Sequence, residues 1–181
     1  LPLVIEAQYR ALAEIPYAGI AATTDLGNPT CIHPARKREV GERLAFLALA
    51  NDYGVKGLPA PAPVYKSMER DGNKLVLTFD NLPVKARNGA DSFVAFGPDG
   101  YRRPAGFEIA GEDRVFHPAV ANFKYWDNRI EVSSDRVPEP VAVRYAFRNY
   151  CPEANVVTTM GQPLAPFRTD DWPLDDIGEI R

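Results

Sequence analysis

An acid and a histidine, Asp25 and His33, stand eight positions apart in the first quarter of the sequence. Near pH 7 a neutral imidazole can take the proton of a hydroxyl nucleophile and return it to a leaving alcohol. A carboxylate on the second ring nitrogen would fix the tautomer and stabilise the imidazolium. The pair therefore has the residue types of a general base and its orienting acid. The residues alone leave open that Asp25 only caps a turn and that His33 is an ordinary loop residue.

The nucleophile that such a base would serve is not evident in the sequence. Cys31 lies two residues before His33, but adjacent loop residues seldom point at one another, which disfavours a thiol nucleophile. No serine lies in a glycine-flanked elbow between a strand and a helix, since all of them fall in predicted strands or at a turn. These serines are Ser67, Ser92, Ser133 and Ser134.

The sequence predicts neither a metal nor a cofactor. No cluster of His, Cys, Asp or Glu has metal-ligand spacing, and no glycine-rich phosphate loop occurs. Basic and acidic residues alternate along one predicted helix, which favours a solvated face over an anion site. The residues of that face are Arg36, Lys37, Arg38, Glu39, Glu42 and Arg43.

The elements that must position Asp25 and His33 follow an α/β pattern. Apolar spacing predicts a helix over 2–14, and the short apolar run at 18–24 suits a buried strand. A second helix is predicted from Pro34 to about Tyr53. The side chains expected to face inward from it are Val40, Leu44, Leu47 and Ala48.

Residues 1–57 thus read as the closing piece of a layered α/β domain. Asp25 follows the predicted strand and His33 opens the second helix, and open α/β sheets hold their functional groups in such loops. One strand cannot form a sheet. This segment therefore needs strands that the chain does not supply.

The pattern changes after residue 57. Residues 58–63 form a proline-rich linker, and 64–150 carry short apolar runs separated by turn signals, which predicts an all-β, sandwich-like domain. Asp71-Gly72 is a strong hairpin signal. Residues 151–181 are rich in Pro and Asp and are expected to form an irregular tail. The predicted strands are 64–70, 74–79, 92–96, 106–110, 114–116, 120–125, 129–133 and 141–147.

Charge and composition exclude some classes of partner. The 181 residues carry a formal net charge of −3, so we expect neither nucleic acid nor an anionic membrane surface as a partner. Apolar stretches such as 44–50 are too short to cross a bilayer. The chain begins at Leu1-Pro2, without an initiator Met or a leader pattern, and we expect it to be a piece of a longer polypeptide.

Several segments resemble, in order, the sialate O-acetylesterase family of the SGNH hydrolases. The resemblance rests chiefly on Asp25-Leu26-Gly27, Ile32-His33-Pro34 with Lys37, and Val40-Gly41-Glu42-Arg43-Leu44-Ala45. It implies an SGNH-type parallel-sheet domain ending near residue 57, with His33 as the general base. Asp25 matches a family aspartate, and Cys31 stands where many members carry an acid. Further similar segments are Glu6-Ala7-Gln8, Gly106-Phe107-Glu108-Ile109-Ala110-Gly111, Ala142-Val143-Arg144-Tyr145-Ala146-Phe147 and Pro166-Phe167-Arg168-Thr169-Asp170.

The resemblance also implies the missing parts and the substrate. The nucleophilic serine and the oxyanion-holding residues of the family lie far upstream, so this chain alone is expected to be inactive. The missing N-terminal part would be a separate chain or a lost fragment. The implied substrate is an acetylated sugar, either sialic acid or a plant polysaccharide, and the implied setting is secreted, periplasmic or lysosomal. The alternative is a non-catalytic β-sandwich module for carbohydrate binding or interaction.

Overall fold

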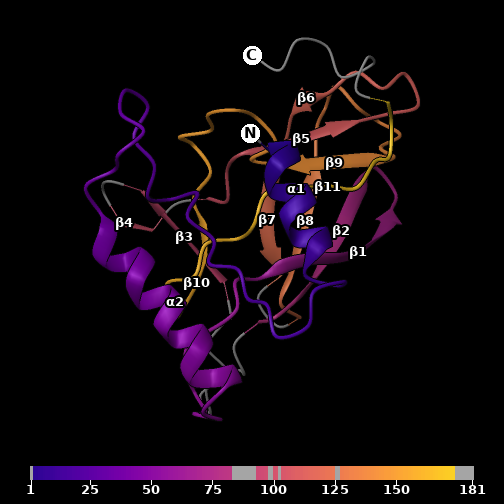
Figure 1. Ribbon diagram of the computed structural model, residues 1–181. Helices are drawn as coiled ribbons and strands as arrows, with labels where there is room; N and C mark the ends of the chain where they lie inside the picture. The colour runs from indigo at the N-terminus through magenta and orange to yellow at the C-terminus, as the bar shows by residue number, and fades with distance from the viewer. Residues whose placement is uncertain (1, 83–92, 98–99, 102, 125–126, 174–181) are drawn as a thin grey trace.

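The computed structural model describes residues 2–82, 93–97, 100–101, 103–124 and 127–173. These residues form a mostly β protein with two helices, in which the described strands pair antiparallel (Figure 1). Neither helix within these ranges has the length and apolar character needed to cross a bilayer.

The two helices are shorter than the sequence predicts. Helix α1 spans Pro2–Ala11, and helix α2 spans Lys37–Asn51. Pro34 precedes α2 without joining it, because Arg36 at the start of the helix has a non-helical backbone (φ −78°, ψ 58°). Gly54 follows α2 with φ +68°, the left-handed conformation that glycine adopts readily after a helix end.

The strand predicted at 18–24 is not formed within the described residues. Residues 18–23 have no regular secondary structure, and no ladder pairs them with another described segment. A strand is maintained by hydrogen bonds to a neighbouring strand, and the described residues offer none here. Only Ala22 in this segment is buried.

The first hairpin formed as predicted, although its turn is displaced by one residue. Strands β1 (Val64–Asp71) and β2 (Lys74–Asp80) pair with Asp71 opposite Lys74, so the two loop residues are Gly72 and Asn73. Gly72 has φ +61°, whereas Asn73 is not among the residues with positive φ. A type II′ turn has this pattern, with glycine at its first central position.

The described strands form three sheets. A four-stranded sheet has the order β1-β2-β8-β7, a second has the order β11-β9-β5-β6, and a three-stranded sheet has the order β10-β3-β4. The remaining strands are β3 (Phe93–Gly97), β4 (Gly100–Tyr101), β5 (Phe107–Ala110), β6 (His117–Pro118), β7 (Val120–Lys124), β8 (Arg129–Ser133), β9 (Ala142–Tyr145), β10 (Val156–Thr158) and β11 (Phe167–Arg168).

One strand prediction and the prediction of an irregular tail need correction. Residues 114–116 form no strand, and the pairing begins one residue later at β6. The segment after Cys151 is not wholly irregular, because it supplies β10 and β11 to two different sheets. Ser92, Tyr125 and residues 174–181, which other predicted elements include, lie outside the described residues.

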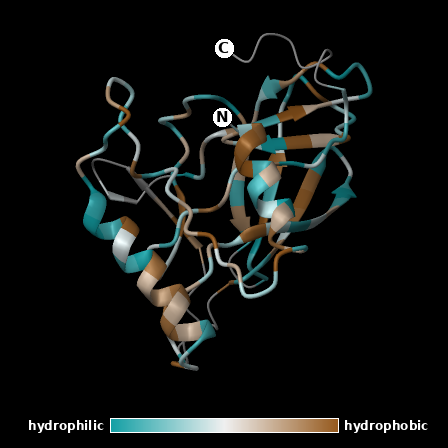
Figure 2. Cartoon of the chain, viewed as in Figure 1, coloured by the Kyte–Doolittle hydropathy of each residue, from teal (hydrophilic) through white to brown (hydrophobic). Residues whose placement is uncertain are grey.

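One hydrophobic core joins the three sheets. It contains Leu77 and Ile130 from the first sheet, Ile109 and Val143 from the second, and Val156 from the third, all at most 1% exposed. Figure 2 shows these strands as mainly hydrophobic, while the apolar C-terminal half of α2 lies apart from them. Both four-stranded sheets therefore contribute to a core that α2 does not share.

The proline-rich segment 58–63 packs against this β region. Ala60 and Ala62 are each 4% exposed, and the backbone N–H of Ala165 donates to the carbonyl of Pro63 at 3.1 Å.

Both cysteines, Cys31 and Cys151, are free thiols. Burial is the main cause that raises the pKa of the Cys151 thiol to about 11.

Candidate functional site

His33 is exposed, and it belongs to the loop that connects residues 18–23 to α2. Figure 1 shows this loop above the start of α2. The loop is built from local hydrogen bonds: Asn28 Oδ1 accepts from the N–H and the hydroxyl of Thr30, both at 2.9 Å. Leu26, 3% exposed, anchors the start of the loop, whereas Ile32 beside the histidine is 90% exposed. The imidazole is therefore open to solvent on a loop that is fixed at its base.

Cys31 contacts the backbone of His33 and not its ring. The His33 N–H donates to Cys31 Sγ at 3.4 Å, and the thiol lies 3.5 Å from the His33 carbonyl oxygen. Among the residues that the structure describes, the imidazole itself has no hydrogen-bonding partner. No residue in the described ranges therefore fixes its tautomer.

Asp25 is paired with Arg43 instead of with His33. Arg43 Nη1 and Nη2 donate to the two Asp25 carboxylate oxygens, each at 2.7 Å. Arg43 is only 7% exposed, although the alternation of charges predicted a solvated position. The spacing of residues in the sequence could have predicted this burial. Val40, Arg43 and Leu47 lie at intervals of three and four residues, which places them on one face of α2.

Two of the described serines, Ser67 and Ser134, form hydrogen bonds away from His33. Ser67 Oγ lies 2.7 Å from Thr78 Oγ1 across the β1–β2 hairpin, and Ser134 Oγ donates to the carbonyl of Pro118 at 3.1 Å. Within the described part of the chain, no serine hydroxyl is hydrogen-bonded to His33. No three His, Cys, Asp or Glu side chains gather there as a metal site would require.

A buried ionic network, which was not predicted, ties α1 to the second sheet. Arg144 Nε and Nη2 donate to the two oxygens of Asp170 at 2.9 and 2.8 Å, and these side chains are 5% and 1% exposed. Arg168 continues the network to Glu6 of α1 at 3.2 Å. The Arg144 guanidinium also lies 3.8 Å from the centre of the Phe116 ring. An arginine between apolar residues of a strand, as in Val143-Arg144-Tyr145, was the available signal that a buried partner exists.

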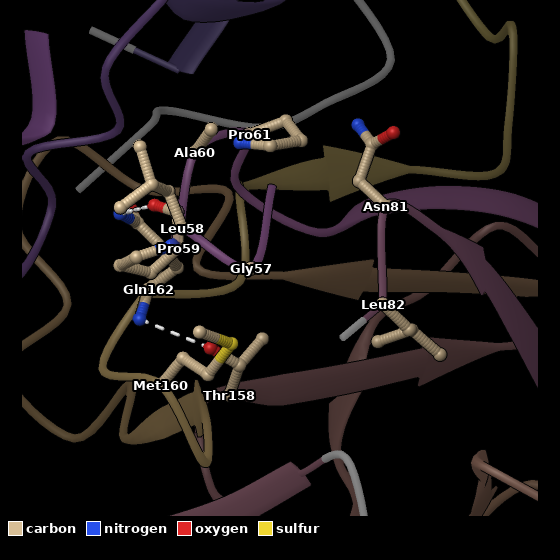
Figure 3. A pocket seen from close by; sticks show the side chains of 10 residues that line it. All are labelled: Gly57, Leu58, Pro59, Ala60, Pro61, Asn81, Leu82, Thr158, Met160 and Gln162. Atoms are coloured by element: carbon tan, nitrogen blue, oxygen red, sulfur yellow. Dashed lines mark hydrogen bonds between the residues drawn. The ribbon is translucent and has the colours of Figure 1, made fainter. Parts of the chain in front are cut away.

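A cavity of about 450 Å³ opens between the proline-rich segment and the turn after β10. Figure 3 shows its lining, which includes Pro59, Asn81, Met160 and Gln162. The Gln162 side-chain amide donates to the Pro59 carbonyl, and its backbone N–H donates to Thr158 Oγ1. These hydrogen bonds serve to hold the wall together.

The site as described can accept and donate a proton, but it contains no nucleophile positioned for that proton transfer. The exposed imidazole of His33 is the available base, and the Asp25 carboxylate is neutralised by a buried guanidinium. If His33 serves as the base for a hydroxyl nucleophile, that hydroxyl must come from outside the described residues.

The comparisons with known proteins found a similarity among solved structures. No protein-family model and no curated protein matches the chain. Among solved structures, the chain is similar to a carbohydrate acetylesterase from Xanthomonas citri, with 42% sequence identity and a TM-score of 0.81. The similarity covers 94% of this chain and 36% of the acetylesterase, so the chain spans well under half the length of the protein that it resembles.

Proposed function

We propose that this chain is the C-terminal part of a carbohydrate O-acetylesterase of the SGNH type, similar to sialate O-acetylesterases. The observation that carries the proposal is the 42% identity to a carbohydrate acetylesterase over 94% of the chain. The resemblance of the segments around Asp25 and His33 to the sialate O-acetylesterase family supports the finer assignment.

The proposed reaction is acyl transfer with His33 as the base. A serine from polypeptide outside this chain attacks the acetyl carbonyl while His33 accepts its proton. The imidazolium then protonates the departing sugar oxygen, leaving an acetyl-serine. Water, deprotonated by His33, attacks this ester, and acetate and the free serine result. The exposure of His33 supports this role, because a base must reach a substrate.

The partner that supplies the serine is proposed to cover the N-terminal region of this chain. Two observations support that surface. Residues 18–23 pair with no described strand, and α2 exposes an apolar stripe although the sequence predicted that part of it would face inward. The stripe consists of Leu44, Ala45, Ala48 and Leu49.

The alternative, a non-catalytic β-sandwich module, would leave His33 without a purpose. That hypothesis expects residues 1–57 to fold back on the β region and bury the histidine. His33 is exposed instead, so the structure favours the esterase over the module.

Acetate release tests the proposal directly. The chain alone should not hydrolyse p-nitrophenyl acetate, whereas its complex with the preceding polypeptide should do so. His33→Ala should reduce the rate of the complex by about 10³-fold or more, since residues of a serine triad act as a unit. Turnover by the chain alone that His33→Ala abolishes would show that the chain contains a nucleophile after all. Undiminished turnover by the His33→Ala complex would refute the assignment. O-acetylated sialic acid and acetylated xylan, assayed in parallel, separate the two substrate classes.

A further inference from the structure

The Asp25–Arg43 pair is built more closely than a surface ion pair. The guanidinium lies almost fully buried, and it donates both to the carboxylate and to the carbonyl of Ala22, at 2.6 Å. Arg43 Nη2 also lies 3.5 Å from the carbonyl of Gly161, on the turn after β10. Such bidentate, charge-assisted hydrogen bonds fix both orientation and position.

These contacts connect four parts of the chain. Arg43 belongs to α2, Ala22 to the segment without regular structure, Asp25 to the start of the His33 loop, and Gly161 to the β region. The loop is closed at its other end as well, because Arg36 Nη1 donates to the carbonyl of Asp25 at 3.3 Å. His33 therefore lies on a loop whose two ends meet at Asp25.

The burial of Arg43 also restricts which partners the Asp25 carboxylate can take. If its carboxylate turned to a histidine ring, the Arg43 guanidinium would lose its charged partner in a nearly dry position, which is strongly unfavourable. Both carboxylate oxygens already accept hydrogen bonds from Arg43.

We propose that Asp25 and Arg43 are positioning residues, which hold the base of the His33 loop against α2 and the β10 turn, and that Asp25 is not the acid that orients the imidazole. This inference rests on the proposed function only for its effect on activity. The clasp formed by Asp25, Arg43 and Ala22 is a property of the chain itself. The orienting acid would then come from outside the described residues.

The first test uses the 181-residue chain and needs no activity. Arg43→Gln should raise the amide hydrogen-exchange rates of residues 23–36 by at least tenfold, while exchange in β2 and β8 stays unchanged. Arg38→Gln is the matched control, because Arg38 lies on the same helix and pairs with Glu42 at an exposed position. Equal exchange in the two variants would overturn the clasp. Should Arg43→Gln fail to fold, Arg43→Lys, which keeps the charge and loses the fork, should give an intermediate increase.

The second test uses the active complex and a double-mutant cycle. Asp25→Asn and Arg43→Gln should each lower kcat by about 10- to 100-fold with little change in KM, and the double variant should be no slower than either. An orienting acid behaves differently: Asp25→Asn alone would cost about 10⁴-fold and Arg43→Gln far less. That pattern would overturn the positioning role.

The two failures remain distinguishable. If His33→Ala left turnover intact, the proposed function would fail, while the hydrogen-exchange test would still decide whether the clasp holds the loop. If His33→Ala abolished turnover and both clasp variants kept the wild-type kcat, only the positioning role would fail.

Discussion

Tyr9 and Tyr145 both bury their hydroxyl oxygens, but these oxygens differ in hydrogen bonding. Tyr145 Oη accepts the backbone N–H of Val156 at 3.1 Å, whereas Tyr9 Oη has no partner within the described residues. Burial raises the pKa of Tyr9 to about 12. A buried hydroxyl without a hydrogen-bonding partner destabilises the folded state. Removing a hydroxyl that does have a partner is worse than removing an unpaired one, because the partner is then left buried and unpaired.

Substitution by phenylalanine should separate the two tyrosines. Tyr9→Phe removes an unpaired hydroxyl and should leave the free energy of unfolding unchanged or raise it by about 1 kcal/mol. Tyr145→Phe leaves the Val156 N–H buried without an acceptor and should lower it by about 1–3 kcal/mol. Urea denaturation of the two variants measures the difference. Equal losses in both would contradict the unpaired state of the Tyr9 hydroxyl.

The cysteines predict a reactivity contrast and a pH effect. Because the thiolate is the reactive form, Cys151, whose pKa burial raises to about 11, should react with iodoacetamide at pH 8 more than tenfold slower than the exposed Cys31. The folded state holds the Cys151 proton more tightly than the unfolded chain does. This contribution to stability is present below about pH 9 and is lost as the pH rises toward 11. Peptide mapping of the alkylated protein, and a Cys151→Ala variant that loses less stability at high pH, check the two statements.

At the scale of the elements, the sequence predicted what local pattern can determine. Apolar spacing found both helices, and the glycine turn found the β1–β2 hairpin. Residues 18–24 carry an apolar composition suited to a strand, yet pairing depends on neighbours that local pattern does not reveal. β10 and β11 were missed for the converse reason, since each is two or three residues long and exists through its partner strand.

The site was predictable to a similar extent. The sequence located His33 on a loop that precedes a helix, where the structure has it. It paired Asp25 with His33 on the basis of residue types, while the structure pairs Asp25 with Arg43. That preference arises from burial of the guanidinium, which becomes apparent only once α2 and residues 18–25 are placed together.

The backbone constraint at Gly106 could not be predicted from the sequence either. Gly106 has φ +91°, and a Cβ there would lie 2.9 Å from Ala154 Cα.

Two ion pairs between elements should differ greatly in strength. Asp170→Asn removes one partner of the buried pair with Arg144, between β9 and the segment after β11, and should lower the free energy of unfolding by about 3–5 kcal/mol. Asp80→Asn breaks the pair with Lys66 across the first hairpin, where both side chains are more than half exposed, and should cost about 0–1 kcal/mol. Urea denaturation compares the two, and losses of similar size would contradict the burial of the Arg144–Asp170 pair.

At the scale of the whole molecule, the β region and the N-terminal segment differ in how completely they are packed. The β region has a core whose central residues are nearly inaccessible, whereas α2 buries Arg43 and Leu47 and leaves an apolar stripe exposed. The matched acetylesterase is much longer than this chain, since the chain covers 36% of it. An exposed stripe of this kind is expected where further polypeptide packs.

Charge placed on that stripe should therefore affect assembly and not the folding of the chain. Leu44 and Leu49 are 52% and 38% exposed, so Leu44→Glu with Leu49→Glu should change the free energy of unfolding of the chain by less than about 1 kcal/mol. In the proposed complex with the preceding polypeptide, the same charges would be buried without partners, and the affinity should fall by about 100-fold or more. Leu47→Ala is the matched control, because Leu47 is 7% exposed and its side chain lies against Gly19. This substitution should lower the free energy of unfolding of the chain by about 2–5 kcal/mol. Calorimetric titration of the preceding polypeptide into each variant measures the affinity. Wild-type affinity in the doubly charged variant would mean that the partner binds elsewhere, and that the serine serving His33 is not brought in over α2.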